Sequence, residues 1–251
     1  MPWIHPCRLV GRHPGGLRFR PANPLPHGNV VVDMLISYTH RFLFVHIAKT
    51  GGTSIRAALR RYRWGWPYSG PLLLCDLLSQ MTRPRHILGI KFPRHAKAIA
   101  AQEMLPRAFY ESLFKFTVVR NPWDLQVSSY HHLRHEHPRL LDGVPSFEAF
   151  LERKLDPARG REDLLDVSQE LQSDYVVDLR GNLIVDYIAH YERLEDDFTE
   201  ICRRIGLSHP PLPRLRQAEG RTDYRDYYSA KARALVTRHY AADLERFGYS
   251  F

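Results

Sequence analysis

The stretch from Arg41 to Arg61, which reads RFLFVHIAKTGGTSIRAALRR, decides the fold class. Its apolar part, Phe42 to Ala48, has strand length and many aromatic and β-branched residues, so it predicts a buried strand of a parallel sheet. The glycines that follow allow positive φ and close approach of the backbone, and Thr53 or Ser54 is expected to cap the next helix. A strand, a glycine loop and a helix N-terminus in this order predict an α/β domain.

The glycine loop also predicts an anion site. Backbone N–H groups and the positive end of the helix dipole face one point, and Lys49 adds a full charge there. A phosphate or sulfate ester fits such a loop. It differs from a Walker A loop, because Lys49 precedes Gly51 and Gly52 and no apolar strand ends in an evident Walker B Asp.

A second motif, FKFTVVRNPWDLQVSSY, runs from Phe114 to Tyr130. It predicts a buried strand that ends at Arg120 and a helix that Asn121 caps, with Pro122 in its first turn. Ser128 lies on the same helix face as Asn121, so Arg120 and Ser128 are expected to converge on one ligand. An Arg fork suits bidentate phosphate binding, and the Ser hydroxyl adds a donor.

These two motifs resemble those of the sulfotransferases, in particular the carbohydrate branch with the chondroitin, dermatan and heparan 2-O enzymes and many bacterial relatives. The resemblance spans about residues 38 to 251. It implies a single P-loop-NTPase-like α/β domain with a central, mainly parallel sheet flanked by helices. It also implies that 3′-phosphoadenosine 5′-phosphosulfate (PAPS) is the co-substrate and adenosine 3′,5′-bisphosphate (PAP) the product. The residues that it assigns to this nucleotide are Lys49, Thr50, Gly51, Gly52, Thr53 and Ser54 for the 5′-phosphosulfate, and Arg120 and Ser128 for the 3′-phosphate.

In this branch of the family, the catalytic base looks to be a His that precedes a short Ala-rich helix. The resemblance therefore implies His95 as the base, because an Ala-rich segment follows it. Relatives often read His-Ala-Thr-Ala, whereas this chain has His-Ala-Lys-Ala from His95 to Ala98. A His suits removal of the proton from an attacking hydroxyl. A structural or merely exposed His95 stays open, with His86 as the other candidate base.

The predicted helix after Arg120 continues into four histidines. His131 and His135 have the i, i+4 spacing of a metal pair, but no third ligand is evident and no metal is expected. The pattern around Tyr191 and Glu192 is interpreted as core scaffold. The basic loop from Arg214 to Arg225 has two equal interpretations, a segment that closes over the nucleotide or acceptor and a solvated loop.

Composition limits the other choices. The chain has 251 residues, a net charge of +9 and 44% hydrophobic residues, which suits one soluble domain with a polyanionic ligand. Residues 1–33 are rich in Pro and Arg and are expected to form a disordered extension before the domain at 34–251. No stretch reaches the length of a membrane span, so we expect a cytoplasmic bacterial enzyme without an integral membrane segment.

The hypothesis is therefore a PAPS-dependent sulfotransferase that moves the sulfuryl group to a hydroxyl by in-line attack, with Lys49 and His95 as catalytic residues. The acceptor is expected to be a carbohydrate or small metabolite, with an acidic glycan slightly favoured by the net charge. Two alternatives stay open, a Mg-dependent P-loop kinase and a basic nucleic-acid-binding protein. The sequence does not determine the oligomeric state.

Overall fold

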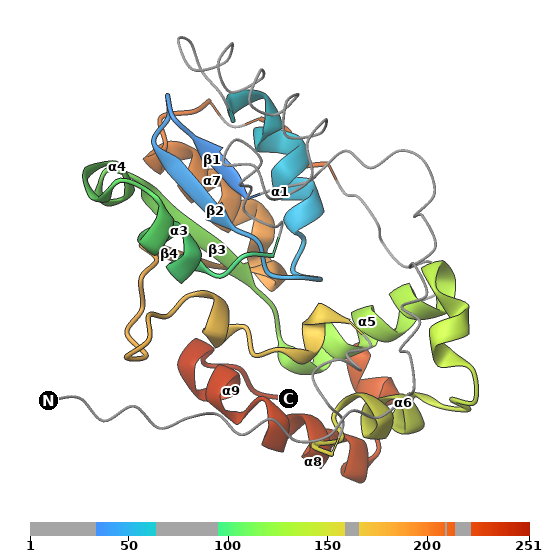
Figure 1. The fold of residues 1–251 in the computed structure, drawn as a ribbon. Coiled ribbons are helices and arrows are strands. Elements are labelled where there is room, and N and C mark those ends of the chain that lie inside the picture. The colour runs from blue at the N-terminus through green and yellow to red at the C-terminus, as the bar shows by residue number, and fades with distance from the viewer. Residues whose placement is uncertain (1–33, 64–94, 159–165, 209, 214–221) are drawn as a thin grey trace, which may run out of the picture. The chain divides into compact units, whose positions relative to one another are not determined.

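The computed structural model describes residues 34–63, 95–158, 166–208, 210–213 and 222–251 (Figure 1). Contacts group Val32–Phe251 into one compact unit. The predicted extension at 1–33, His86 and most of the basic loop from Arg214 lie outside the described residues. The described part contains a four-stranded sheet in the order β1-β2-β3-β4. Its strands are β1 (Leu35–Ser37), β2 (Phe42–Val45), β3 (Phe114–Val119) and β4 (Tyr187–His190).

The sheet is mainly parallel, as predicted. β2 pairs with β3 in parallel, with Phe44 opposite Phe116, and β3 pairs with β4 in parallel, with Thr117 opposite Ile188. Only β1 runs antiparallel to its neighbour β2. The carboxyl ends of β2 and β3 therefore lie side by side, which brings the glycine loop close to Arg120.

Helices cover both faces of the sheet. Successive side chains of a strand point to opposite faces, and on β2 Leu43 and Val45 pack in one apolar cluster while Phe42 and Phe44 pack in another. The first cluster includes residues of α3 (Ala98–Met104) and α4 (Arg107–Glu111). The second includes residues of α1 (Gly52–Leu59) and α7 (Leu194–Arg204), which lie together in Figure 1. The predicted α/β fold with flanking helices is confirmed.

A third apolar cluster joins four further helices. They are α5 (Pro122–Glu136), α6 (Phe147–Lys154), α8 (Ala230–His239) and α9 (Ala241–Phe247). The sequence favours one helix over the last two ranges, but the chain breaks at Tyr240. The Tyr240 side chain is fully buried, and its hydroxyl donates to the carbonyl of Ser168 (2.7 Å). This tertiary contact fixes the break. Within the described ranges, no helix is long and apolar enough to cross a bilayer.

Candidate active site

The glycine loop connects β2 to α1 through two residues with positive φ. Lys49 has φ 66° and Gly51 has φ 82°, and Gly51 is the N-cap of α1. The helix thus begins at Gly52, and Thr53 and Ser54 lie inside its first turn, so the expectation that one of them caps it is wrong. The cap position needs a left-handed backbone, which Gly adopts at little cost. By helix geometry the N–H groups of Gly52 and Thr53 have no intrahelical acceptor and suit an anion, whereas the N–H of Ser54 donates to the carbonyl of Gly51 (3.0 Å).

Close packing explains why both glycines are present. A Cβ on Gly52 would lie 2.0 Å from the imidazole of His46, and a Cβ on Gly51 would lie 3.0 Å from the side chains of Leu194 and Tyr191. The loop is therefore clamped between the end of β2 and the start of α7. Any side chain at Gly52 must displace His46.

Thr50 faces inward. It is fully buried, and its hydroxyl donates to the carbonyl of Ile47 (3.0 Å). This bond braces the loop from inside. The hydroxyl is directed away from the outer surface of the loop. Thr50 can therefore contact the nucleotide through its backbone N–H alone.

Arg120 joins the two motifs. Its side chain is buried, its Nε donates to Asp124 Oδ2 (2.6 Å), and its Nη1 donates to the carbonyl of Lys49 (2.8 Å). Its Cζ lies 3.9 Å from the ring centroid of Tyr191. Burial lowers the pKa of the guanidinium from 12.5, while Tyr191 and Glu192 oppose that shift. Arg120 therefore holds the strained backbone of Lys49 while it presents a buried cation.

The start of α5 is fixed by Asn121, as predicted. Its side chain accepts from the N–H of Trp123 (3.0 Å), and its Nδ2 donates to the carbonyl of Ser250 (3.1 Å). Its own N–H donates to Glu192 Oε1 (2.7 Å), and Glu192 Oε2 accepts from the hydroxyl of Tyr249 (2.9 Å). This network connects β3, the segment before α7 and the C-terminal residues. The interpretation of Glu192 as scaffold missed these contacts beside Arg120.

His95 lies next to the end of β2. Its Nδ1 is 2.9 Å from the carbonyl oxygen of His46, and the two imidazole centroids are 4.6 Å apart. A carbonyl only accepts, so Nδ1 carries the proton in this bond. In the neutral ring, Nε2 is then the basic nitrogen. The predicted Ala-rich helix after His95 is present as α3.

One cavity of about 1540 Å³ brings the predicted residues together. Apart from Thr50, every residue proposed for the nucleotide or for catalysis lines it. These residues are Lys49, Gly51, Gly52, Thr53, Ser54, His95, Arg120 and Ser128. The cavity wall also contains Tyr191, which was interpreted as scaffold, and residues that the sequence did not single out, among them Asp166, Val167 and Tyr249. Arg225, the last residue of the predicted basic loop, lines the cavity as well.

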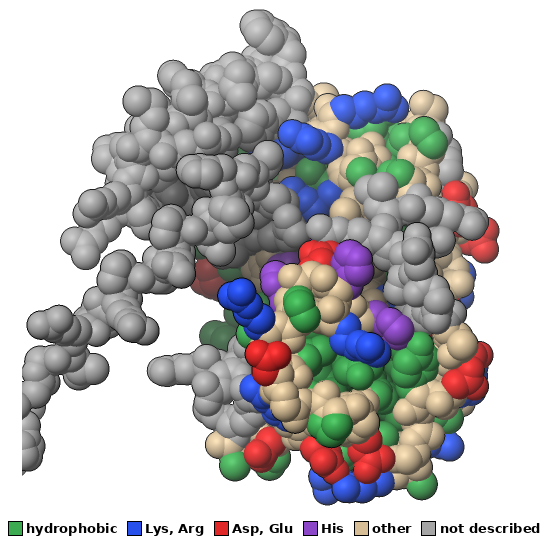
Figure 2. All heavy atoms as spheres, turned by 90° about the vertical axis from the view of Figure 1, so that its right-hand side faces the viewer, with side chains coloured by type: hydrophobic (Ala, Val, Ile, Leu, Met, Phe, Trp, Pro, Cys, Tyr) green, Lys and Arg blue, Asp and Glu red, His purple; other side chains and the backbone are tan. Residues whose placement is uncertain are grey.

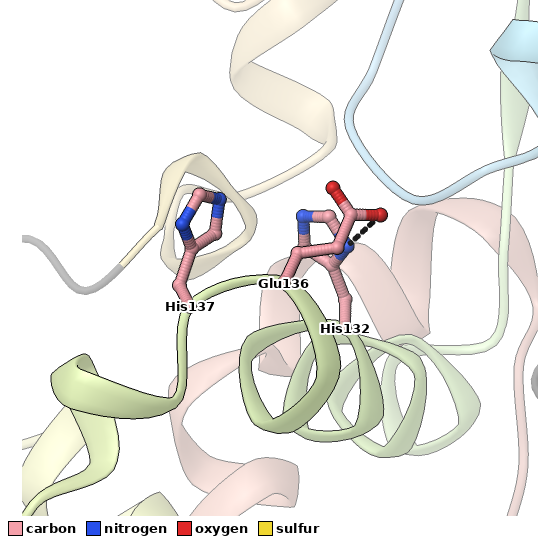
Figure 3. A group of neighbouring side chains, drawn as sticks. All are labelled: His132, Glu136 and His137. Carbon is pink, nitrogen blue, oxygen red and sulfur yellow. Dashed lines mark ion pairs between the residues drawn. The ribbon is translucent and has the colours of Figure 1, made fainter. Parts of the chain in front are cut away.

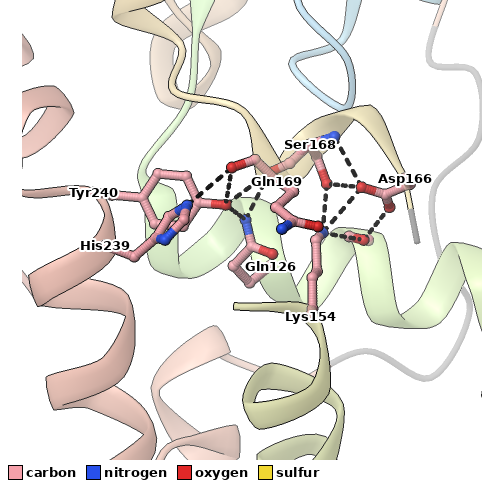
Figure 4. A network of polar contacts seen from close by, with 8 residues as sticks. Gln126, Lys154, Asp166, Ser168, Gln169, His239 and Tyr240 are labelled. Atoms are coloured by element: carbon pink, nitrogen blue, oxygen red, sulfur yellow. Dashed lines mark hydrogen bonds and ion pairs between the residues drawn. The ribbon is translucent and has the colours of Figure 1, made fainter. Parts of the chain in front are cut away.

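A buried polar network supports the wall at Asp166 (Figure 4). Lys154 is fully buried, and its Nζ donates to Ser168 Oγ (2.7 Å), Ser129 Oγ (2.9 Å) and Asp166 Oδ1 (3.0 Å). Burial raises the pKa of Asp166, but the charge of Lys154 and the Ser129 and Ser168 hydroxyls outweigh it, so the pKa lies well below 3.8. No local pattern predicts this pair, since the two residues belong to different elements.

Histidines gather on one face of the molecule (Figure 2), and His131, His132 and His135 line the cavity. The ring Nε2 of His131 is 2.8 Å from the hydroxyl of Tyr227. Burial, followed by the charge of Arg134, lowers the pKa of His131 from 6.5. His131 thus packs against Tyr227, and no three-residue set in the described part of the chain pairs it with His135.

Comparisons with known proteins agree with the motifs. A sequence profile described as the sulfotransferase family matches residues 32–250. The crystal structure of mouse sulfotransferase SULT7A1 complexed with PAP matches 84% of this chain and 86% of its own, at 15% sequence identity and a TM-score of 0.47. The search of curated proteins gave no match.

Proposed function

The chain belongs to the sulfotransferase family, and on this premise we propose how its cavity moves the sulfuryl group of PAPS to an acceptor hydroxyl. The prediction of a sulfotransferase is confirmed by the family assignment, and PAPS as its donor is part of our proposal. The residue roles are our proposal. The observation that carries them is that one cavity receives the glycine loop, His95, Arg120 and Ser128 from four separate places in the sequence.

The donor would bind at the two motifs. The loop leaves no room for a Cβ at Gly52, and the N–H groups of Gly52 and Thr53 together with Lys49 form a donor set for the 5′-phosphosulfate. Arg120 and Ser128 would bind the 3′-phosphate. Two of the five N–H donors of Arg120 bond Asp124 and Lys49, which fixes the guanidinium plane before a ligand arrives. A preorganised cation of this kind binds an anion without a large reorganisation cost.

The chemistry would need a base and charge stabilisation. His95 Nε2 would take the proton of the acceptor hydroxyl as its oxygen forms a bond to sulfur and the bond from sulfur to the phosphate oxygen breaks. The His46 carbonyl holds the required tautomer through Nδ1. Lys49 would stabilise the negative charge that develops on the departing phosphate. No step in this scheme requires a metal ion.

The acceptor is proposed from the cavity wall. Its described residues include the exposed carboxylates Glu195, Asp196 and Asp223 as well as Arg193 and Arg225. Charge of both signs is therefore present, and the net charge of +9 is not concentrated on this wall. We accordingly propose a neutral carbohydrate or small-metabolite hydroxyl ahead of an acidic glycan. We also propose that the protein is a bacterial, cytoplasmic enzyme.

Calorimetric titration with PAP tests the donor site. The wild type should bind PAP without a metal and in preference to AMP or to ATP with Mg²⁺. Ser128→Ala should weaken binding by about 10-fold, which is the effect of one hydrogen bond to a charged group, and Arg120→Ala should abolish it. Arg134→Ala is the control, because Arg134 is exposed on the same helix away from the cavity.

Three results would overturn the donor site. Preference for ATP with Mg²⁺ would favour a kinase, and unchanged PAP affinity in Ser128→Ala would remove the proposed 3′-phosphate contact. Binding of single-stranded DNA or RNA that falls steeply with salt, without PAP binding, would favour the nucleic-acid alternative.

The base is tested by turnover. PAP release from PAPS would be followed with a panel of simple sugars and phenols, and the best acceptor would be used for the variants. His95→Ala should lower kcat by about 10²-fold or more and leave PAP affinity nearly unchanged. His40→Ala is the control, since His40 packs on Tyr62 outside the cavity. A normal rate in His95→Ala would exclude His95 and make His86 the next candidate.

A further inference from the structure

The C-terminal end of α5 carries a cluster of three potential metal ligands (Figure 3). His132 and Glu136 lie one turn apart on the helix, and His132 Nδ1 is 3.1 Å from Glu136 Oε1. His137 is the C-cap, and its N–H donates to the carbonyl of Leu133 (2.9 Å). The three side chains point to the same side of the helix end, and one ligand atom from each lies within 4.8 Å of the others.

The chemistry of this set suits a divalent transition metal. Imidazole nitrogens and a carboxylate oxygen are the usual ligands of Zn²⁺, at about 2.0–2.2 Å, so two ligand atoms on one ion lie about 3–3.5 Å apart. The pair of His132 and Glu136 already has that separation. The His137 and His132 ring centroids are 5.7 Å apart at an interplanar angle of 86°. Rotation of the exposed His137 side chain is the change needed for three ligands to meet on one ion.

The helix itself favours a cation at this position. The last carbonyl groups of a helix have no intrahelical donor, and the helix dipole places negative charge there. α5 has 15 residues, so its dipole is fully developed. Arg134 and Arg139, the basic residues nearest to this cluster in the sequence, are both exposed. We propose that His132, Glu136 and His137 bind a divalent transition-metal ion of the Zn²⁺ class.

The proposed ligands differ from the pair with metal spacing in the sequence, for which no metal was expected. His131 and His135 have the i, i+4 spacing, but the His131 ring is engaged by Tyr227. His132 is one residue further around the helix and meets Glu136 instead. The third ligand, His137, is supplied by the turn of the chain at the helix end, which helical spacing does not predict.

An ion bound at this position would affect the binding of PAP at the proposed donor site. His132 and Glu136 line the cavity, and His132 lies one helical turn beyond Ser128. An ion there adds positive charge at the end of the cavity where we place the 3′-phosphate. Metal and PAP should therefore strengthen each other's binding, a step that rests on the proposed function.

Titration with ZnCl₂ tests the site. The full chain, treated with a chelator and dialysed, would be titrated by calorimetry, and Co²⁺ would be added separately to record its visible absorption. His137→Ala and Glu136→Gln should each weaken Zn²⁺ binding by more than about 10–100-fold, the usual loss for an outer-shell partner alone. They should also remove the Co²⁺ spectrum of this site. All three side chains are partly or fully exposed, so these variants should fold.

His135→Ala is the matched control, since it removes an exposed imidazole from the same helix and should leave Zn²⁺ affinity unchanged. The chain has 14 histidines, so the variants and not the stoichiometry assign the site. Zn²⁺ affinity that is unchanged in both ligand variants, or that is lost in His135→Ala, would overturn the proposal.

The coupling has its own measurement. PAP affinity would be compared with Zn²⁺ and with chelator present, in wild type and in His137→Ala. PAP binding that is tighter with Zn²⁺ than with chelator in the wild type, but not in His137→Ala, supports the coupling. Equal PAP affinities with Zn²⁺ and with chelator in the wild type overturn it. A chain that binds Zn²⁺ but no PAP under any condition would contradict the proposed donor site instead, so the two failures are distinguishable.

Discussion

Two ion pairs with the same i, i+4 spacing lie in opposite surroundings, one where β3 passes into α5 and the other at the C-terminal end of α5. Near its start, Arg120 and Asp124 have side chains that are 4% and 14% exposed. At its end, His132 and Glu136 have side chains that are 21% and 38% exposed. Equal spacing in the sequence thus gives a buried charge pair at the entry to α5 and a partly hydrated pair at its C-terminal end.

This difference separates a fixed site from an adjustable one. Arg120 also holds the Lys49 carbonyl and packs on Tyr191, so its position is determined by contacts from three elements. Breaking a buried pair leaves an uncompensated charge, whereas a partly exposed pair loses little when one partner is removed. His132 and Glu136 can exchange their mutual contact for water or an ion. Burial, rather than spacing, therefore decides which end of the helix is preorganised.

The largest loss of stability is expected at the buried end. Arg120→Ala leaves Asp124 without its cation and releases the Lys49 carbonyl, so the free energy of unfolding should fall by about 3–5 kcal/mol. Urea unfolding measures this loss. In the double variant with Asp124→Asn, the two losses should not add, because the residues are in contact. A loss of stability below about 1 kcal/mol would show that the pair of Arg120 and Asp124 contributes no more than an exposed ion pair does, and the contrast with His132 and Glu136 would not hold.

The middle of α5 offers a second buried test. Ser129 of α5 contacts Lys154 and Asp166, and Asp166→Asn leaves Lys154 buried without a carboxylate, at a cost of about 3 kcal/mol. The folded pKa of Asp166 is below its ordinary 3.8, so its stabilisation is present above that pH and is lost as the pH falls. The variant resembles protonated Asp166. The stability gap between wild type and variant should thus narrow between about pH 5 and about pH 3 in urea unfolding. A gap that stays constant over this range would contradict the lowered pKa.

A substitution in the glycine loop, whose Lys49 carbonyl Arg120 holds, should cause a smaller loss of stability. Gly52→Ala places a Cβ 2.0 Å from the His46 ring, and such overpacking should destabilise the chain by about 1–3 kcal/mol. Turnover should fall further than stability implies, because the His46 carbonyl also orients His95. Gly143→Asn is the control, since Gly143 has φ 75° with no atom near its Cβ position and Asn accepts that backbone. Thermal unfolding and PAP release would be measured for both. Equal losses of stability and turnover in Gly52→Ala and Gly143→Asn would show that the His46 side chain moves aside at little cost.

Local patterns predicted much of the fold and of the site. Apolar runs located β2 and β3, and the adjacency of parallel strand ends predicted that the Lys49 loop and Arg120 would meet. Cap chemistry placed the start of α5 at Asn121. These signals depend on neighbouring residues, so the sequence displays them directly.

The missed features depend on contacts between distant residues. The break at Tyr240 arises from a hydrogen bond to Ser168, and no Gly or Pro marks it in the sequence. The contact of Tyr191 with Arg120 is likewise absent from any local pattern. The inward hydroxyl of Thr50 follows from loop geometry that the motif alone does not specify. A family motif thus identifies residue types at a site, while burial and tertiary contacts decide which atoms face the ligand.

The smallest effect is expected at the exposed end, and it is the sharpest measure of the contrast. His132→Ala without metal should change the free energy of unfolding by no more than about 0.5 kcal/mol, because the pair with Glu136 is partly hydrated. With Zn²⁺ at about 100 times its Kd, the wild type should gain about 2.7 kcal/mol by mass action, and the variant should gain far less. Urea unfolding with Zn²⁺ or with chelator separates the two terms. A large loss without metal would mean that this pair is structural like that of Arg120, whereas an equal gain in both proteins would place the ion elsewhere.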